Sequence, residues 1–320
     1  MRAAAFLLVL LAGAAQGQQT ADAARWLEKI YDATQKLSYS GTFVYRQGER
    51  SETSRITRLV DASGDTEKLE ALDGVPREVV RKGDEIRCYL PDSMTVKVDR
   101  RTDQRGFPMM LSAQISSIGA HYTITKGERA RIAGYECQAI VLTPKDELRY
   151  GYKLWADMRT GMLLKARIFN EKGDVVEDFT FTQLKVGGNI DRRRLAPTLQ
   201  AKGRDWHVED SAVLPAKLAE SGWIVKPDLP GFHKVVEVKR MLRESRQVGQ
   251  VVYSDGLAAV SVFIEPSEGR REPVQAGLSA MGAINIFTRE VFNHVVTVVG
   301  EVPAANVQRI SNSVEYRRAQ

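Results

Sequence analysis

Residues Thr42 to Val98 decide the fold, and their sequence is TFVYRQGERSETSRITRLVDASGDTEKLEALDGVPREVVRKGDEIRCYLPDSMTVKV. Short runs of alternating, β-branched and aromatic residues recur through it, and pairs such as Ser63-Gly64 and Asp73-Gly74 separate them as turn signals. The runs are Thr42 to Arg46, Ser54 to Val60, Thr66 to Leu72, Arg77 to Arg81, Glu85 to Leu90 and Met94 to Val98. Strands that follow one another with turns every 8–12 residues or so predict an antiparallel meander. A parallel sheet would need a helix between successive strands, and the stretch contains none.

The pattern continues on both sides of this stretch. Before it, Trp26 to Leu37 places apolar residues at helical spacing. After it comes an apolar segment, Phe107 to Ile118, which we predict to be helical because Pro108 suits a first helical turn. A second meander follows, with runs at His121 to Lys126, Arg129 to Ile132, Glu136 to Thr143, Arg149 to Ala156, Leu163 to Asn170 and Val175 to Val186. Together they predict one large curved sheet with helices against one face.

A break in the pattern divides the chain into two domains. Residues 191–217 hold three consecutive arginines, two prolines and little periodicity, which indicates a linker between a first domain, residues 18–190, and a second, residues 218–320. In the second domain, strand-like runs at 232–242, 248–264, 283–288 and 293–299 predict a small α+β domain. Its last element is expected to be a helix opening at Pro303, with Val307, Ile310 and Val314 on the buried face.

The first residues are typical of a secretory signal peptide. Arg2 precedes an unbroken apolar run from Ala3 to Ala15, which is shorter than the roughly 20 residues that span a bilayer. Ala15-Gln16-Gly17 puts small residues at a cleavage site, so we expect removal of residues 1–17 after Gly17. An uncleaved anchor is the alternative. No cysteine follows the run and no later segment is as apolar, so we expect a soluble protein of the bacterial periplasm.

Composition narrows the classes of function. Forty-six Lys and Arg against 40 Asp and Glu leave a formal net charge of +6, spread along the chain, so charge does not indicate a nucleic-acid partner. Four histidines and two cysteines in different predicted elements offer no ligand set for a zinc site. The sequence contains no phosphate-binding glycine loop, nucleophile elbow or metalloprotease motif. We therefore predict a protein that is not an enzyme and needs no cofactor or metal.

The two cysteines, Cys88 and Cys137, each lie in a predicted strand. Two alternatives stay open for them. One is a disulfide, which by closing a loop of about 50 residues would contribute roughly 4 kcal/mol in the chain-entropy model. The other is a pair of small buried residues on strands that are not neighbours.

Several blocks of the sequence together resemble one family, the MucB/RseB periplasmic regulators of the extracytoplasmic stress (sigma-E) sigma factor. In the first domain the blocks are Leu72-Asp73-Gly74 with Arg77-Glu78-Val79-Val80, then Arg131-Ile132-Ala133-Gly134 and Arg149-Tyr150-Gly151-Tyr152. In the second domain they are Tyr253-Ser254-Asp255-Gly256-Leu257, Ser261-Val262-Phe263-Ile264-Glu265-Pro266 and Val296-Thr297-Val298-Val299-Gly300-Glu301-Val302-Pro303. Each block is weak alone, and their order and spacing over nearly the whole mature chain make the resemblance specific.

The resemblance implies both a fold and a function. The fold is α+β: a half-open antiparallel β-barrel with helices on its concave side, similar to periplasmic lipoprotein carriers, plus a smaller C-terminal α+β domain. The function is negative regulation of the sigma-E envelope stress response. The regulator binds the periplasmic domain of a membrane-spanning anti-sigma factor and shields it from site-one proteolysis, until lipopolysaccharide or lipoprotein acyl chains release it. A homodimer is compatible with the resemblance, and a lipid carrier or sensor without an anti-sigma partner is the alternative function.

Two groups of residues are candidates for these contacts. For the anti-sigma factor we favour Tyr253, Ser254, Asp255, Gly256 and Leu257 together with Gly300 and Glu301. The alternative is that Gly256 and Gly300 serve the fold by supplying positive φ. For lipid we favour Phe107, Met109, Met110 and Leu111 with Tyr45 and Trp155, because methionine suits adaptable apolar surfaces. The alternative there is ordinary core packing.

Overall fold

The computed structural model describes residues 22–100, 115–199, 205–210, 213–227, 229–241, 247–268 and 274–317. The predicted signal peptide with its cleavage after Gly17 lies outside the described residues, as do the candidate lipid-binding residues Phe107, Met109, Met110 and Leu111. In the described part of the chain, no helix is both long enough and apolar enough to cross a membrane.

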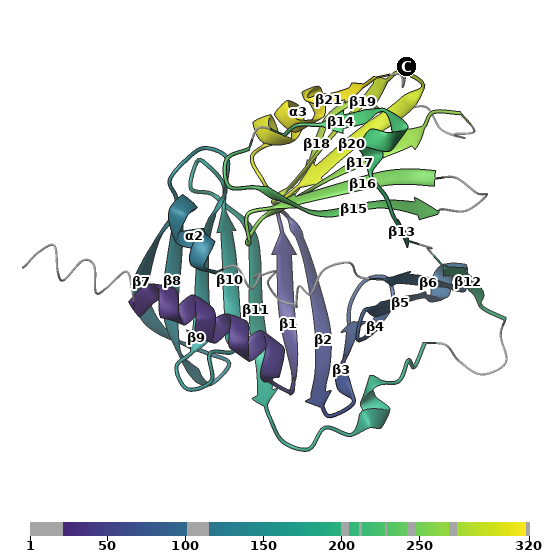
Figure 1. The fold of residues 1–320 in the computed structure, drawn as a ribbon. Helices are drawn as coiled ribbons and strands as arrows, with labels where there is room; N and C mark the ends of the chain where they lie inside the picture. The colour runs from purple at the N-terminus through teal and green to yellow at the C-terminus, as the bar shows by residue number, and fades with distance from the viewer. Residues whose placement is uncertain are drawn as a thin grey trace, which may run out of the picture.

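The first domain is built on one twelve-stranded sheet (Figure 1). Its strands are β1 (Tyr39–Gln47), β2 (Arg50–Asp61), β3 (Gly64–Ala71), β4 (Glu78–Lys82), β5 (Glu85–Leu90), β6 (Thr95–Arg100), β7 (Tyr122–Ile132), β8 (Tyr135–Pro144), β9 (Gly151–Asp157), β10 (Leu163–Phe169), β11 (Val175–Val186) and β12 (His207–Asp210). The order across the sheet is β12-β6-β5-β4-β3-β2-β1-β11-β10-β9-β8-β7, and its two edges do not pair with each other. The half-open barrel is therefore confirmed, with one parallel pair, β12 against β6, among antiparallel ones.

The two predicted meanders are joined by a single pairing, because β1 forms an antiparallel ladder with β11 from Tyr39↔Val186 to Gln47↔Glu177. A helix over residues 22–36 lies against the β7–β11 half of the sheet (Figure 1). Its buried residues Ala23, Leu27 and Ile30 recur every three or four positions, so they form one apolar stripe. They share a core with Ile140, Leu154 and other residues from β8 and β9, where each fully buried Leu or Ile contributes roughly 1.5–3 kcal/mol.

The predicted linker is attached to the first sheet rather than hanging free. A 3-10 turn, η2 (Arg192–Leu195), is followed by Thr198 and Leu199, whose backbone amides donate to Oε2 of Glu78 at 2.7 and 3.0 Å. The side chain of Glu78 is 3% exposed, and its other oxygen lies 2.9 Å from Nζ of Lys68, which is 1% exposed. Burial would raise the pKa of Glu78, but hydrogen bonds from Thr198, Leu199 and Lys68 outweigh it and hold the pKa below its usual value.

Glu78→Gln is therefore expected to lower the free energy of unfolding by about 1.5–3 kcal/mol at pH 7, the usual worth of a hydrogen bond to a charged group. A carboxylate whose pKa is depressed by folding contributes stability above its unfolded pKa, near 4.5, and loses it as pH falls through the folded value. Urea unfolding of the variant and the wild type should thus differ at pH 7 and converge toward pH 3. Glu85→Gln, at an exposed pair with Arg87, is the matched control and should show no change.

The second domain has a seven-stranded antiparallel sheet in the order β13-β15-β16-β17-β20-β19-β18 and a two-stranded sheet, β14-β21. Its elements are β13 (Val213–Pro215), η3 (Leu218–Ser221), β14 (Trp223–Val225), β15 (His233–Met241), β16 (Gln247–Ser254), β17 (Ala259–Pro266), β18 (Gly277–Met281), β19 (Ile284–Val291), β20 (His294–Gly300), α3 (Ala304–Asn312) and β21 (Val314–Tyr316). Helix α3 packs Val307 and Ile310 on the core of this sheet.

The structure contradicts the expected position of Val314. The C-terminal helix stops at Asn312, and Val314, expected on its buried face, is the first residue of strand β21, which pairs with β14. Of the helix predicted for 107–118, the described residues show only its end, as α2 (Ile115–His121). The described part of residues 191–217 also contains strands β12 and β13, which join the two different sheets. Short edge strands of this kind carry too few residues for a periodic pattern.

Candidate functional site at the domain junction

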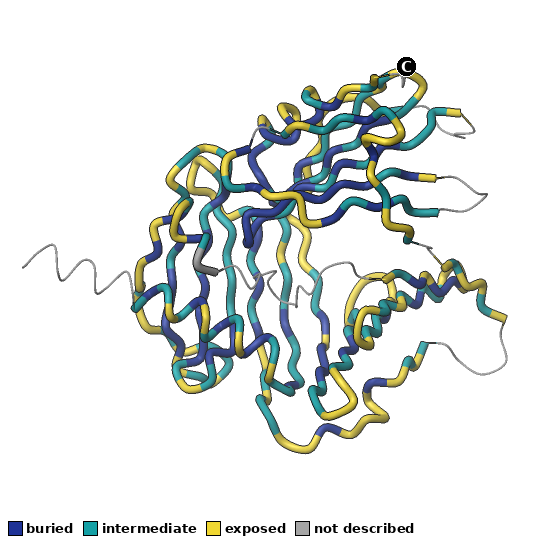
Figure 2. The backbone as a smooth tube through the Cα atoms, in the orientation of Figure 1, coloured by how far each residue is buried: buried dark blue, intermediate teal, exposed yellow. Residues whose placement is uncertain are grey.

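A tight turn between β16 and β17 lies where the two domains meet. Asp255 organises it, because its Oδ1 accepts hydrogen bonds at 2.9 Å from the backbone amides of both Leu257 and Ala258. Gly256 completes the turn with φ +101°, a backbone conformation that only glycine adopts without strain. Figure 2 shows this stretch in unbroken dark blue at the contact between the domains, and every residue from Val251 to Ala258 is buried.

Arg149 of the first domain holds the turn from the other side. Its Nε donates to Oδ2 of Asp255 at 2.7 Å, Nη1 to Oδ2 of Asp146 at 2.5 Å, and Nη2 to the carbonyl of Pro230 at 2.5 Å. The guanidinium carbon lies 4.8 Å from the centre of the Phe232 ring. Arg149 is 1% exposed and Asp255 4%, so this is a buried ion pair with its remaining groups hydrogen-bonded.

Gly231 fits the second domain closely against Arg149. Its φ is +82°, and a Cβ there would lie 2.1 Å from Nε2 of His121 and 2.6 Å from Nη2 of Arg149. A side chain would therefore push the carbonyl of Pro230 away from the guanidinium. Burial and the nearby charge of Arg149 both lower the pKa of His121, which keeps a second positive charge out of the junction.

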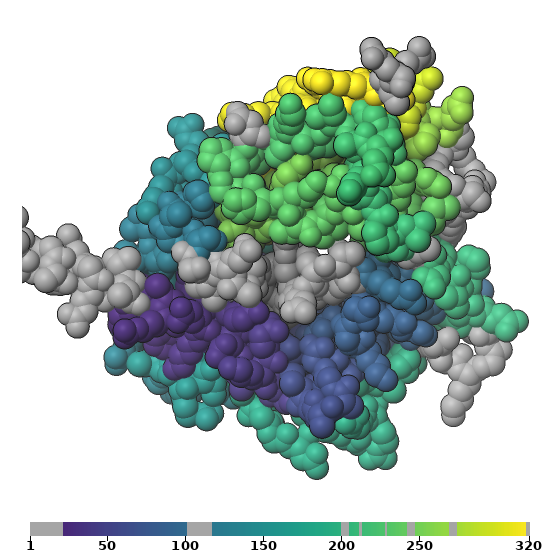
Figure 3. Space-filling view, in the orientation of Figure 1, coloured from purple at the N-terminus to yellow at the C-terminus, as the bar shows by residue number. Residues whose placement is uncertain are grey.

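Leu257, at the tip of the turn, belongs to the core of the other domain. It is 3% exposed and shares an apolar cluster with Leu27, Tyr122, Leu142 and their neighbours in the first domain. The two domains are thus joined by shared apolar packing as well as by the ion pair. In Figure 3 the teal surface of the first domain adjoins the green surface of the second directly.

A second set of polar contacts joins the hairpin β18–β19 to the strand ends of the first domain. The side-chain amide of Gln47 donates to Oε1 of Glu177 and to the carbonyl of Met281, each at 3.0 Å. Oε1 of Glu177 also accepts from the amide of Ala283 at 3.3 Å. Nearby, Nδ2 of Asn285 donates to the hydroxyl of Tyr150 at 2.8 Å. Because these groups come from separate strands, they fix the angle between the domains.

The residues predicted to bind the anti-sigma factor come together here, but as part of the junction. Tyr253 is buried in the core of the second domain, Ser254 to Leu257 are buried in the turn, Gly300 is buried, and Glu301 is partly exposed. Gly256 has the positive φ of the alternative explanation. Gly300 does not have a positive φ. A glycine is needed at this position because a Cβ would lie 2.8 Å from a methyl group of Val260. Arg149 was not predicted as a partner of this turn, although it opens one of the blocks that carry the resemblance.

The candidate lipid-binding residues in the described part of the chain are Tyr45 and Trp155, which belong to one apolar cluster but lie on opposite faces of the sheet. Tyr45 pairs with Phe179, Phe179 with Ala166 and Ala166 with Leu154, so Leu154 and not Trp155 shares the face of Tyr45. Tyr45 faces aromatic residues, and burial and then the carboxylate of Glu177 raise its pKa well above the usual range. On the opposite face, Lys153, Lys165 and Arg167 lie 5.0, 5.6 and 5.8 Å from the ring centre of Trp155.

The disulfide that the sequence left open between Cys88 and Cys137 is not formed, and both residues are free thiols. Cys88 is in β5 and Cys137 in β8, with seven strands between them in the order of the sheet. A disulfide needs Cα atoms within about 7 Å, which strands this far apart in the sheet do not provide. Burial, followed by the charge of Asp157, raises the pKa of the Cys137 thiol to about 12, so it stays protonated.

Within the described ranges, no cluster of three or more His, Cys, Asp or Glu residues could hold a metal ion. The contacts at the junction hold the two domains in one orientation.

Two family models match this chain. The family model described as the MucB/RseB N-terminal domain matches residues 22–199, and the model for the MucB/RseB C-terminal domain matches residues 217–315.

The chain belongs to the MucB/RseB family. It is 32% identical to the sigma factor AlgU regulatory protein MucB of Pseudomonas aeruginosa over 98% of both chains. It is 25% identical to the sigma-E factor regulatory protein RseB of Escherichia coli K12, covering 92% of this chain and 91% of that one. Among solved structures, a crystal structure of MucB in complex with MucA(peri) aligns with a TM-score of 0.69 and 29% identity over 93% of this chain and all of that one. A crystal structure of MucB aligns with a TM-score of 0.67.

Proposed function

We propose that this MucB/RseB family chain is a periplasmic negative regulator of an envelope stress sigma factor. It acts by binding the periplasmic domain of a membrane-spanning anti-sigma factor and shielding that domain from the protease that makes the first cut. It works by binding and not by catalysis, and it is exported through a signal peptide that ends at Gly17. The observation that carries the proposal is the alignment of this chain, over 93% of its length, with a MucB that was crystallised in complex with MucA(peri).

The junction supports this function because it fixes the orientation of the two domains relative to each other. A bound segment that crosses both domains meets a surface whose geometry is already set by Arg149 and Asp255, so less entropy is lost on binding than with a loose pair of domains. The turn Tyr253 to Leu257, together with Gly300 and Glu301, would then serve the anti-sigma contact by positioning the domains. We place the linker at residues 191–217, between domains of residues 18–190 and 218–320.

Release by lipid is a linkage between two binding events. A lipid weakens anti-sigma binding only if it binds the free regulator more tightly than the complex, and a tenfold change requires about 1.4 kcal/mol of coupling. In the described part of the chain, the proposed acyl-chain site is at Tyr45, which packs against the buried rings of Phe43 and Phe179, 4.9 Å apart. Phe107 to Leu111 stay a prediction as the second part of that site.

A protease-protection experiment tests the proposal. The mature chain is incubated with the periplasmic domain of its anti-sigma factor and the site-one protease, with and without lipopolysaccharide. We expect cleavage to slow in proportion to the occupancy of the complex and to recover when lipopolysaccharide is added. Serum albumin at the same concentration is the control for non-specific protection. Absence of protection at a saturating concentration would overturn the regulator proposal, and protection that lipopolysaccharide leaves unchanged would remove the lipid step alone.

A further inference from the structure

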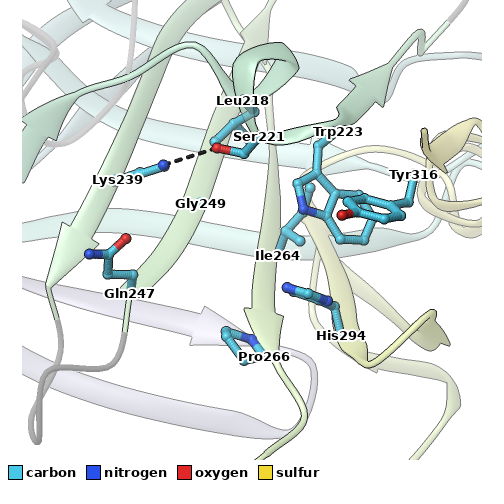
Figure 4. A pocket seen from close by; sticks show the side chains of 10 residues that line it. All are labelled: Leu218, Ser221, Trp223, Lys239, Gln247, Gly249, Ile264, Pro266, His294 and Tyr316. Atoms are coloured by element: carbon cyan, nitrogen blue, oxygen red, sulfur yellow. Dashed lines mark hydrogen bonds between the residues drawn. The ribbon is translucent and has the colours of Figure 1, made fainter. Parts of the chain in front are cut away.

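The second domain contains an open pocket of about 200 Å³ (Figure 4), lined by the start of β16, the end of that strand opposite the turn at Asp255. Its lining comes from η3 and from strands β14, β15, β16, β17, β20 and β21. An apolar cavity of about 150 Å³ is large enough to hold a benzene molecule, so this pocket has room for one aromatic or branched apolar side chain.

One wall of the pocket is aromatic. The ring of Trp223 lies 4.9 Å from the rings of both His294 and Tyr316, and Figure 4 shows the three side chains grouped on one side. Nδ1 of His294 is buried and has no hydrogen-bond partner among the described residues. Burial lowers the pKa of His294, so its imidazole is neutral near pH 7 and adds no charge. Ile264 and Pro266 supply an apolar base between this wall and the opposite rim.

The opposite rim carries a positive charge. Nζ of Lys239 donates to the neutral hydroxyl of Ser221 at 3.0 Å, as drawn in Figure 4. On the same strand, Lys234 is paired with the carboxylate of Glu237. Among the described residues Lys239 has no such ion pair, so no described carboxylate neutralises its charge. An apolar pocket with one ammonium group at its mouth is complementary to an apolar side chain that has a carboxylate beside it.

We propose that this pocket receives an apolar side chain of the bound anti-sigma segment, with an acidic residue of that segment next to Lys239. The inference rests on the proposed function and names the contact chemistry in the second domain. The side chain packs against Trp223 and Tyr316, and the carboxylate replaces Ser221 as the partner of Lys239.

The first test uses the protein alone with three probes. N-acetyl-L-phenylalanine carries both ring and carboxylate, its amide carries only the ring, and N-acetylglycine carries only the carboxylate. We expect the acid to shift the NMR signal of the Trp223 indole N–H, assigned with Trp223→Phe, with a dissociation constant on the order of 1 mM. The amide should bind about fivefold more weakly, the ratio equal to about 1 kcal/mol, and N-acetylglycine should not shift the signal. The proposal would be overturned if the acid caused no shift at 20-fold excess over about 1 mM, or if the acid and the amide bound equally well.

The second test measures binding of the anti-sigma periplasmic domain to Lys239→Gln. We expect about fivefold weaker binding, with the loss disappearing in high salt. Lys234→Gln is the matched control, because Lys234 lies five residues or about 17 Å away along β15 and should leave the affinity unchanged. If wild type and Lys239→Gln bind equally well, the inference fails while the proposed function stands. If the wild type does not bind the anti-sigma domain, the proposed function fails. The three probes still decide whether the pocket binds an aromatic side chain that has a carboxylate beside it.

Discussion

Arg149→Ala is expected to lower the free energy of unfolding by about 3–5 kcal/mol, the usual result of removing one partner from a buried ion pair. The physical reason is that the carboxylate of Asp255, 4% exposed, would stay buried and lose the Arg149 group that lies 2.7 Å from it. The carbonyl of Pro230 and the carboxylate of Asp146 would lose hydrogen bonds as well. Urea unfolding at pH 7, followed by circular dichroism, measures the change.

Two further variants make the result for Arg149 specific. Arg193→Ala removes an arginine that also pairs with an aspartate, Asp191, but on the exposed surface, and it should leave the unfolding curve unchanged. Arg149→Ala combined with Asp255→Ala should cost clearly less than the sum of the two single changes, because the double variant also removes the buried Asp255 carboxylate and leaves only the partly exposed Asp146 without its arginine. Additive losses would show that Arg149 and Asp255 are not coupled.

Leu257→Ala is expected to lower the free energy of unfolding by about 2–5 kcal/mol, as is typical of a large-to-small change in a core. Leu257 is encoded in the second domain but packs in the core of the first, so the cavity would open at the contact between domains. The loss should therefore be accompanied by a larger radius of gyration in small-angle X-ray scattering. Leu278→Ala, at a leucine that is 53% exposed in the same domain, is the control and should be neutral in both measurements. A stable Leu257→Ala variant of unchanged dimensions would contradict a shared core.

Most of the strands could be predicted because the signals that define them are local. Alternation within a strand and turn chemistry between strands depend on residues a few positions apart. The predicted runs of the second meander, for example, coincide closely with β7 to β11. Strands β12, β13, β14, β18 and β21 were missed because three to five residues with no alternation of their own are selected by the neighbouring strand. Val314 shows the same effect, since pairing with β14 removes it from the helix that its spacing suggested.

The candidate site was only partly predictable, for a different reason. The sequence singled out both Arg149-Tyr150-Gly151-Tyr152 and Tyr253 to Leu257, but it carries no signal that they touch. Arg149 and Asp255 are 106 residues apart, and only the folded chain brings them together. Likewise, whether Tyr45 and Trp155 share a face depends on the register of β1, β11, β10 and β9 in turn, and a shift of one residue in any pairing would reverse the answer.

By itself the sequence determined the two meanders, the α+β second domain and, through the order of its blocks, the resemblance to the MucB/RseB family. These follow from local periodicity, turn residues and the linear arrangement of motifs. Only the tertiary structure decided that β1 and β11 join the meanders into one sheet, that Cys88 and Cys137 lie far apart in it, and that the turn at Asp255 is buried by Arg149. Such contacts depend on how strands pair and domains dock across long distances in sequence, which no local pattern of residues encodes.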